Sequence, residues 1–177
     1  MQYKIIGQTV PVVEMRLNQG ETIFTQSGGF AYSGDGVTMT THTHGGIMKG
    51  IGRMFSGESL FMANYTATQD GAKIAFASTM PGKIIAYDIG EGNDGIIAQK
   101  GAFLCAEEGV NVKATLTKNI GVGFFGGEGF ILQDIHGKGR VFLEVDGIIN
   151  KKTLKEGESI LIDTGNVVYF DKSCSYE

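Results

Sequence analysis

The chain repeats part of its own sequence. Residues 17–32 recur as residues 154–169 without a gap, so that Gly157 aligns with Gly20, and Leu, Gly, Glu, Ile, Gly and Tyr are identical in both copies. A weaker middle copy at 96–103 aligns Gly101 with Gly28 of the first copy. Repeats of this kind are supersecondary units that bury their apolar faces against one another. The sequence therefore predicts a single domain, residues 1–177, built of related units.

A second repeated block follows each first block. Residues 55–62 match residues 125–132, and residues 71–74 match residues 139–142, which predicts a hairpin. The spacing of the two blocks is similar in both units, from Gly20 to Gly57 in the first and from Asn93 to Gly127 in the second. A third hairpin would begin a similar distance after Gly157, and the sequence ends at Glu177. We therefore expect units at approximately 10–80, 81–146 and 147–177, the last of them partial.

The pattern of β-prone runs and glycines predicts an all-β fold. The chain has 28 glycines against 2 prolines, and turn signals separate short runs of β-branched and aromatic residues. Such spacing is typical of a sandwich or barrel. A glycine-containing run at 47–55 has helical spacing and predicts a short irregular helical turn. The expected strands are 10–17, 22–26, 30–32, 60–66, 73–78, 83–88, 96–99, 102–106, 112–116, 129–135, 139–145, 159–163 and 167–170.

Charge and cysteine content exclude several classes of protein. The net charge is −4, and the only adjacent basic pair is Lys151-Lys152, which argues against DNA and RNA as partners. No run approaches the roughly 20 apolar residues of a membrane span, so we expect no transmembrane segment. The N-terminal residues lack the pattern of a secretory signal. Cys105 and Cys174 are predicted to be reduced, buried thiols, which favours the cytoplasm.

Several motifs together resemble a known family. They are residues 53–61 (Arg-Met-Phe-Ser-Gly-Glu-Ser-Leu-Phe), Pro81-Gly82, residues 101–104, residues 126–130 (Gly-Gly-Glu-Gly-Phe) and residues 163–170. Their order and spacing resemble the altered-inheritance-of-mitochondria protein 24 family, also described as similar to the tryptophan RNA-binding attenuator protein (TRAP-like), from about residue 10 to 170. The resemblance implies antiparallel β-sandwich lobes around a pseudo-threefold axis, a variant of the double-stranded β-helix. This sequence departs from the family pattern by ending before the last expected hairpin, so we expect the third lobe to be incomplete. The resemblance supplies no catalytic residues.

His42 and His44 form the sharpest chemical motif. In a strand the two imidazoles would face the same side and could hold one metal ion, as in a cupin-like metalloenzyme. Such a site also needs a nearby carboxylate and a further histidine. Glu58 lies too far along the chain, and His136 lies in a repeat hairpin. The competing interpretation is an exposed His-Thr alternation on an edge strand.

Gly-Glu pairs recur at Glu21, Glu58, Glu128 and Glu158. General acid–base catalysis needs two groups that converge on one substrate, whereas equivalent positions lie on different lobes. We expect these glutamates to bond backbone N–H groups at turns instead. The sequence thus predicts a non-catalytic binding or assembly protein without a cofactor, with a second copy or another protein as partner. RNA binding by analogy to the attenuator protein and a cupin-like metalloenzyme are the alternatives.

Overall fold

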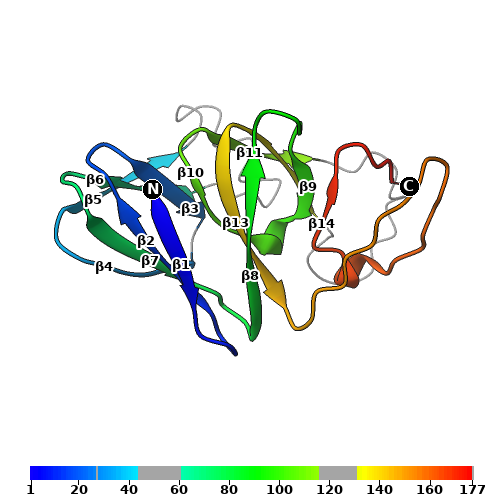
Figure 1. The fold of residues 1–177 in the computed structure, drawn as a ribbon, viewed down its shortest axis with the longest axis horizontal. Helices are drawn as coiled ribbons and strands as arrows, with labels where there is room; N and C mark the ends of the chain where they lie inside the picture. The colour runs from blue at the N-terminus through cyan, green and yellow to red at the C-terminus, as the bar shows by residue number, and fades with distance from the viewer. Residues whose placement is uncertain (27, 44–60, 116–130, 177) are drawn as a thin grey trace.

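The computed structural model describes residues 1–26, 28–43, 61–115 and 131–176, and these residues form an all-β protein (Figure 1). They contain fourteen strands, and their only helices are two 3₁₀ turns of three residues each. All strand pairs are antiparallel. The all-β prediction is confirmed. None of the described helices is long and apolar enough to cross a membrane.

The strands form three sheets. The first contains four strands in the order β1 (Gln2–Ile6), β2 (Val12–Leu17), β7 (Ala72–Ala77) and β4 (Phe30–Ser33). The second contains six, in the order β5 (Val37–Thr43), β6 (Phe61–Ala67), β3 (Thr22–Gln26), β10 (Phe103–Glu107), β13 (Gly139–Asp146) and β8 (Gly82–Ile89). The third contains β11 (Val110–Thr115), β12 (Leu132–Gly137), β9 (Ile96–Gln99) and β14 (Tyr169–Asp171).

The six-stranded sheet is the central layer, because its strands contribute apolar side chains to two separate cores. Along β13, Phe142 packs into one core while its neighbours Val141 and Leu143 pack into the other. Ile23 and Phe24 divide in the same way on β3. Successive side chains of a strand point to opposite faces, so a sheet covered on both faces needs continuous apolar runs rather than alternation.

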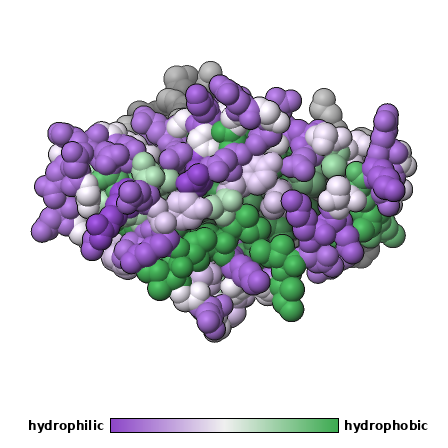
Figure 2. Space-filling view, viewed as in Figure 1, coloured by the Kyte–Doolittle hydropathy of each residue, from purple (hydrophilic) through white to green (hydrophobic). Residues whose placement is uncertain are grey.

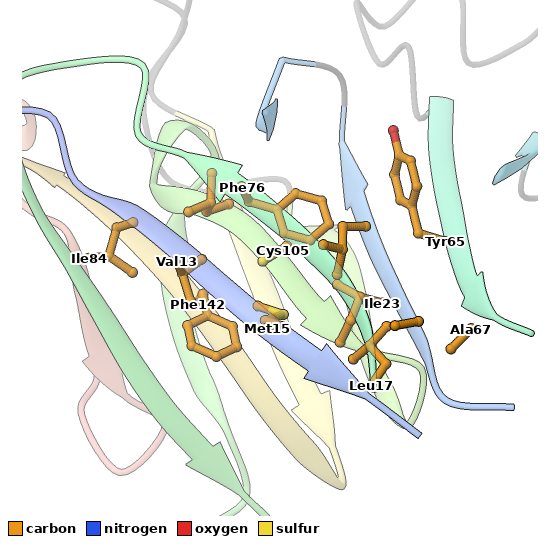
Figure 3. Packing of buried hydrophobic residues seen from close by; sticks show 13 residues of the cluster. Val13, Met15, Leu17, Ile23, Tyr65, Ala67, Phe76, Ile84, Cys105 and Phe142 are labelled. Carbon is orange, nitrogen blue, oxygen red and sulfur yellow. The ribbon is translucent and has the colours of Figure 1, made fainter. Parts of the chain in front are cut away.

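The first core lies between the central sheet and β2 and β7 of the first sheet (Figure 3). Val13, Met15 and Leu17 alternate with more polar residues along β2, so that one face of this strand is fully buried. Phe76 of β7 lies edge-on to Tyr65 of β6, with ring centroids 5.7 Å apart. The second core lies on the opposite face of the central sheet and includes apolar residues of β9 and β12 in the third sheet.

The predicted hairpins are wrong. β6 and β7 follow one another in the sequence but lie in different sheets, and so do β12 and β13. The physical reason is that each first strand has already filled both of its edges. β6 pairs with β3 and β5, and β12 pairs with β9 and β11. The next strand therefore has no free edge to join and crosses to the facing layer.

The expected strands did not include β1, and β5 was anticipated only as the strand that would carry the Thr-His alternation. β1 joins β2 through an antiparallel pairing in which Tyr3 lies opposite Met15. β5 pairs with β6, so the Thr-His alternation does lie on the outermost strand of a sheet. The predicted helical turn at 47–55 lies outside the described residues. The pseudo-threefold axis and the unit boundaries stay predictions.

Replacing Phe142 by alanine should lower the free energy of unfolding by about 3–5 kcal/mol, because the ring is fully buried in the first core. Ile148→Ala is the matched control: Ile148 is 91% exposed and should change stability by less than about 0.5 kcal/mol. Urea denaturation followed by circular dichroism measures both. Equal effects of the two substitutions would contradict this account of the core.

Candidate functional site

The same strand junction occurs twice in the structure. β3 pairs with β10, with Phe24 opposite Ala106. β9 pairs with β14, with Ile97 opposite Phe170. The sequence repeat relates the two junctions, because Ile97 is the repeat equivalent of Phe24 and Phe170 is the repeat equivalent of Ala106. The first strand of one unit therefore pairs with the second strand of the next unit, in the same register each time.

The chain also contains the two halves of a third such junction, and neither is covered. By the repeat, Leu161 corresponds to Phe24, and Phe30 corresponds to Phe103. In the first junction the rings of Phe24 and Phe103 stack with their centroids 5.6 Å apart, and they are only 6% and 5% exposed. Leu161 is 100% exposed and Phe30 is 41% exposed. These two residues lie where buried contacts form in the other copies.

The exposed first half is the segment 160–162, Ile-Leu-Ile, which we call the apolar segment. All three side chains are exposed, although the equivalent residues of the first copy are buried. The prediction of a strand at 159–163 is wrong, because these residues pair with no described strand. β3 and β9 each have a neighbouring strand on both edges, and the apolar segment has none among the described residues. Figure 2 shows apolar residues at the surface at the right-hand end of the molecule, where this part of the chain lies in Figure 1.

The turn before the apolar segment is built in the same way as the turn before β3. Glu21 accepts a hydrogen bond from the backbone N–H of Asn18 at 2.7 Å, and Glu158 accepts one from the backbone N–H of Lys155 at 2.9 Å. Gly20 and Gly157 have φ of 86° and 78°, a left-handed conformation that glycine adopts without strain. The predicted turn role is confirmed for these two glutamates. Glu58 and Glu128 lie outside the described residues.

A hydrogen bond and an aromatic contact hold the second junction closed. The Tyr87 hydroxyl of β8 donates to Asp171 of β14 at 3.0 Å, and the Tyr87 ring lies edge-on to Tyr169 with centroids 5.6 Å apart. Burial and the hydrogen bond to the Asp171 carboxylate raise the pKa of Tyr87 to about 12, because both disfavour a phenolate. β14 therefore contacts β8 of the central sheet and also pairs with β9.

The predicted metal ligands are not brought together by any described contact. His42 lies opposite Met62 near the end of β5, where its side chain is outside the described part of the structure, and His44 lies outside the described residues. Within the described ranges, no three His, Cys, Asp or Glu side chains are grouped so that they could hold a metal ion. His136 instead contacts Asp134 at 3.1 Å. The metal site stays a prediction.

The cysteines differ from each other. Cys105 is fully buried on β10, and burial raises the pKa of its thiol well above the usual value, as expected for a buried structural cysteine. Cys174 is exposed, so the prediction of two buried thiols is wrong for this residue. The reason is its position after β14, where the described residues leave it uncovered.

Two concave sites on the described surface are open depressions rather than enclosed cavities. The larger is a depression of about 380 Å³ beside the β8–β9 turn, with Asp88, Glu91 and Lys138 in its lining. The other, of about 260 Å³, lies between the start of β3 and the β10–β11 turn. Ligand pockets are mostly apolar clefts with a few convergent polar groups. The exposed apolar surface at the two junction halves is therefore the more distinctive candidate site.

The fold and the repeated junction define an all-β protein built by strand pairing between repeated units. The family described as Mitochondrial biogenesis AIM24 matches residues 3–177, and the chain belongs to this family. An uncharacterized protein of Streptococcus pyogenes serotype M6 is 34% identical over 175 residues, which cover 94% of this chain and 68% of that protein. The crystal structure of a Streptococcus pyogenes protein has a TM-score of 0.63 at 29% identity, covering 82% of this chain and 65% of that one. The chain thus spans about two thirds of the length of both relatives.

Sequence reasoning singled out the histidines and missed the uncovered junction halves. The available signal was the repeat itself: positions 24, 97 and 161 are all large and apolar. An apolar residue at all three positions predicts that each is covered by a neighbouring strand. The fold then shows that Leu161 and Phe30 are exposed and that no described strand covers Leu161.

Tyr87→Phe should change how stability depends on pH. A group whose pKa is higher in the folded protein than in the unfolded chain stabilises the fold below the unfolded value, and the contribution is lost as pH rises. The wild type should therefore lose thermal stability relative to Tyr87→Phe between about pH 10 and about pH 12. Thermal melts of both proteins at pH 8 and across this interval measure the effect. Parallel pH profiles would contradict the assigned pKa.

Zinc and nickel titrations test the predicted metal site directly. If His42 and His44 bind one ion, the wild type should give a saturable isotherm in calorimetry, and the double variant His42→Ala/His44→Ala should lose it. His136→Ala is the matched control, because His136 lies on β12 and should leave the isotherm unchanged. Identical isotherms for the wild type and the double variant would refute the metal site.

Proposed function

We propose that this chain is a non-catalytic assembly protein that binds another polypeptide along its uncovered junction halves. The observation that carries the proposal is the 100% exposure of Leu161 at a position where the first copy of the repeat is buried beneath a neighbouring strand. Addition of a strand to an open edge is a common mode of protein recognition, because the main chain supplies hydrogen bonds and alternate side chains supply specificity.

The surface chemistry supports a protein partner over the other classes. The apolar segment carries three adjacent aliphatic residues, and exposed apolar surface of this kind marks sites of protein contact. The net charge of −4 disfavours nucleic acid. The free thiols of Cys105 and Cys174 suit a reducing compartment, so we place this function in the cytoplasm.

Native mass spectrometry of the protein purified without denaturation tests the proposal. The wild type should carry added mass that is polypeptide, and Leu161→Asp should lose it, because a carboxylate buried against an apolar strand is strongly unfavourable. Ile148→Asp is the matched control, since Ile148 is equally apolar and exposed but lies outside the repeated junction. The control should retain the added mass.

Three results would overturn the proposal. Added mass that is RNA would favour the RNA-binding alternative, and added mass that is a metal ion would favour the cupin-like alternative. Polypeptide that stays bound to Leu161→Asp would show that the partner contacts another surface.

A further inference from the structure

We propose that the partner is a second copy of this chain, and that copies associate head to tail by completing the third junction between them. In this arrangement the apolar segment of one copy pairs antiparallel with β4 of the next. The inference rests on the proposed function and specifies its partner. It follows from the two junctions that the chain already forms within itself.

The internal junctions fix the register of the proposed contact. Phe24 lies opposite Ala106 in the first junction, and the second junction repeats this pairing one copy later. Leu161 is the repeat equivalent of Phe24, and Ser33 is the repeat equivalent of Ala106, so the third junction places Leu161 opposite Ser33. The antiparallel direction then sets the neighbouring pairs, with position 162 opposite position 32 and position 160 opposite position 34.

The side chains on the two halves complement each other in the same way as in the first junction. Phe24 of β3 stacks on Phe103 of the following unit and covers it. At the proposed contact, Leu161 takes the place of Phe24 and Phe30 takes the place of Phe103. Phe30 already stacks on Tyr65 with ring centroids 4.8 Å apart, so its own copy holds it in a fixed orientation. Leu161, packed on the exposed side of the Phe30 ring, would bury both side chains.

The backbone of β4 has an edge available for pairing. Among the described strands, β4 pairs with β7 alone. The Gly34 N–H donates to Lys73 of β7 at 2.9 Å, and backbone groups of successive residues in a strand point to opposite edges. The N–H and carbonyl of Ser33 therefore point away from β7. This is the position that the register places opposite Leu161.

β4 is short, with 4 residues and a register shift between Phe30 and Tyr32, but it carries none of the charged residues that protect other sheet edges. Edge strands avoid unwanted pairing by carrying charged residues, especially lysine. Of the other outer strands, β1, β8 and β11 carry Lys4, Lys83 and Lys113, whereas β5 carries neither lysine nor a carboxylate. β4 reads Phe-Ala-Tyr-Ser and carries no charge. Its sequence suits a strand that is covered in the assembled protein.

The two halves lie toward opposite ends of the described part of the structure. In Figure 1, which is drawn with the longest axis horizontal, β4 lies toward the left-hand end and the segment before β14 lies at the right-hand end. One copy therefore presents the apolar segment at one end and the open edge of β4 at the other. Contacts between different surfaces of successive copies are heterologous, so they extend beyond a dimer into a ring or a filament.

Sedimentation velocity across about 1–200 µM protein tests this arrangement with two variants that each disable one half. The wild type should form species larger than a dimer. Leu161→Asp places a charge in the apolar segment. Ser33→Pro removes the backbone N–H that would donate a hydrogen bond to this segment, at an edge where proline is tolerated. Each variant alone should be monomeric, with an apparent association constant at least about 100-fold weaker. An equimolar mixture should form dimers and nothing larger, because one intact apolar segment and one intact edge of β4 remain.

Ile148→Asp is the control and should assemble as the wild type does. Thermal melts show whether Ser33→Pro folds, and Leu161→Asp tests the proposal by itself because a fully exposed side chain can be replaced without affecting the fold. A wild type that stays monomeric, a Leu161→Asp variant that assembles, or a mixture of folded variants that stays monomeric would overturn the inference. Native mass spectrometry could also show that the wild type binds a different polypeptide and that Leu161→Asp does not. That result would overturn this inference, while the proposed function would stand.

Discussion

The rest of the structure depends on the pairing of β3 with β10. This pairing joins strands of the first and second sequence repeats into one six-stranded sheet, and its strands other than β5 contribute buried side chains to the cores on both faces. Without it the chain would divide into two smaller sandwiches, each with an uncovered edge and with Phe24 and Phe103 exposed. The Thr25 hydroxyl, which donates to the carbonyl oxygen of Leu104 at 2.5 Å, adds a buried polar contact across the same junction. Aromatic stacking and hydrogen bonding thus both stabilise the pairing of β3 with β10.

A second consequence of this sheet is the side-chain pattern of its strands. β10 reads Phe-Leu-Cys-Ala-Glu, with its first four residues buried: Leu104 and Cys105 enter the first core, and Phe103 and Ala106 enter the second. A single sandwich would have required a polar residue at every second position. Such a strand cannot be exposed on either face without uncovering apolar surface. The first and second units therefore fold together rather than one at a time.

The sequence predicted the local features well and the long-range ones poorly. Turns such as the one before Glu158 depend on a few adjacent residues, so their glycine and glutamate were sufficient to identify them. The sheet that each strand joins depends on which edges distant strands have already filled, and this is why the predicted hairpins failed. The same limit applies to the candidate site. An apolar run such as Ile-Leu-Ile at 160–162 predicts burial, and only the fold reveals that no described strand covers it.

The repeated junction gives a simple reason why the uncovered halves should fit each other. Two surfaces that arise independently match only by coincidence, whereas residues 160–162 and β4 are further copies of surfaces that already match inside this molecule. The apolar character of the pair is kept: Phe24 faces Phe103 in the first junction, and Leu161 would face Phe30 in the proposed one. Assembly between chains then needs no new surface. It repeats, from one copy to the next, a contact that each copy must form in order to fold.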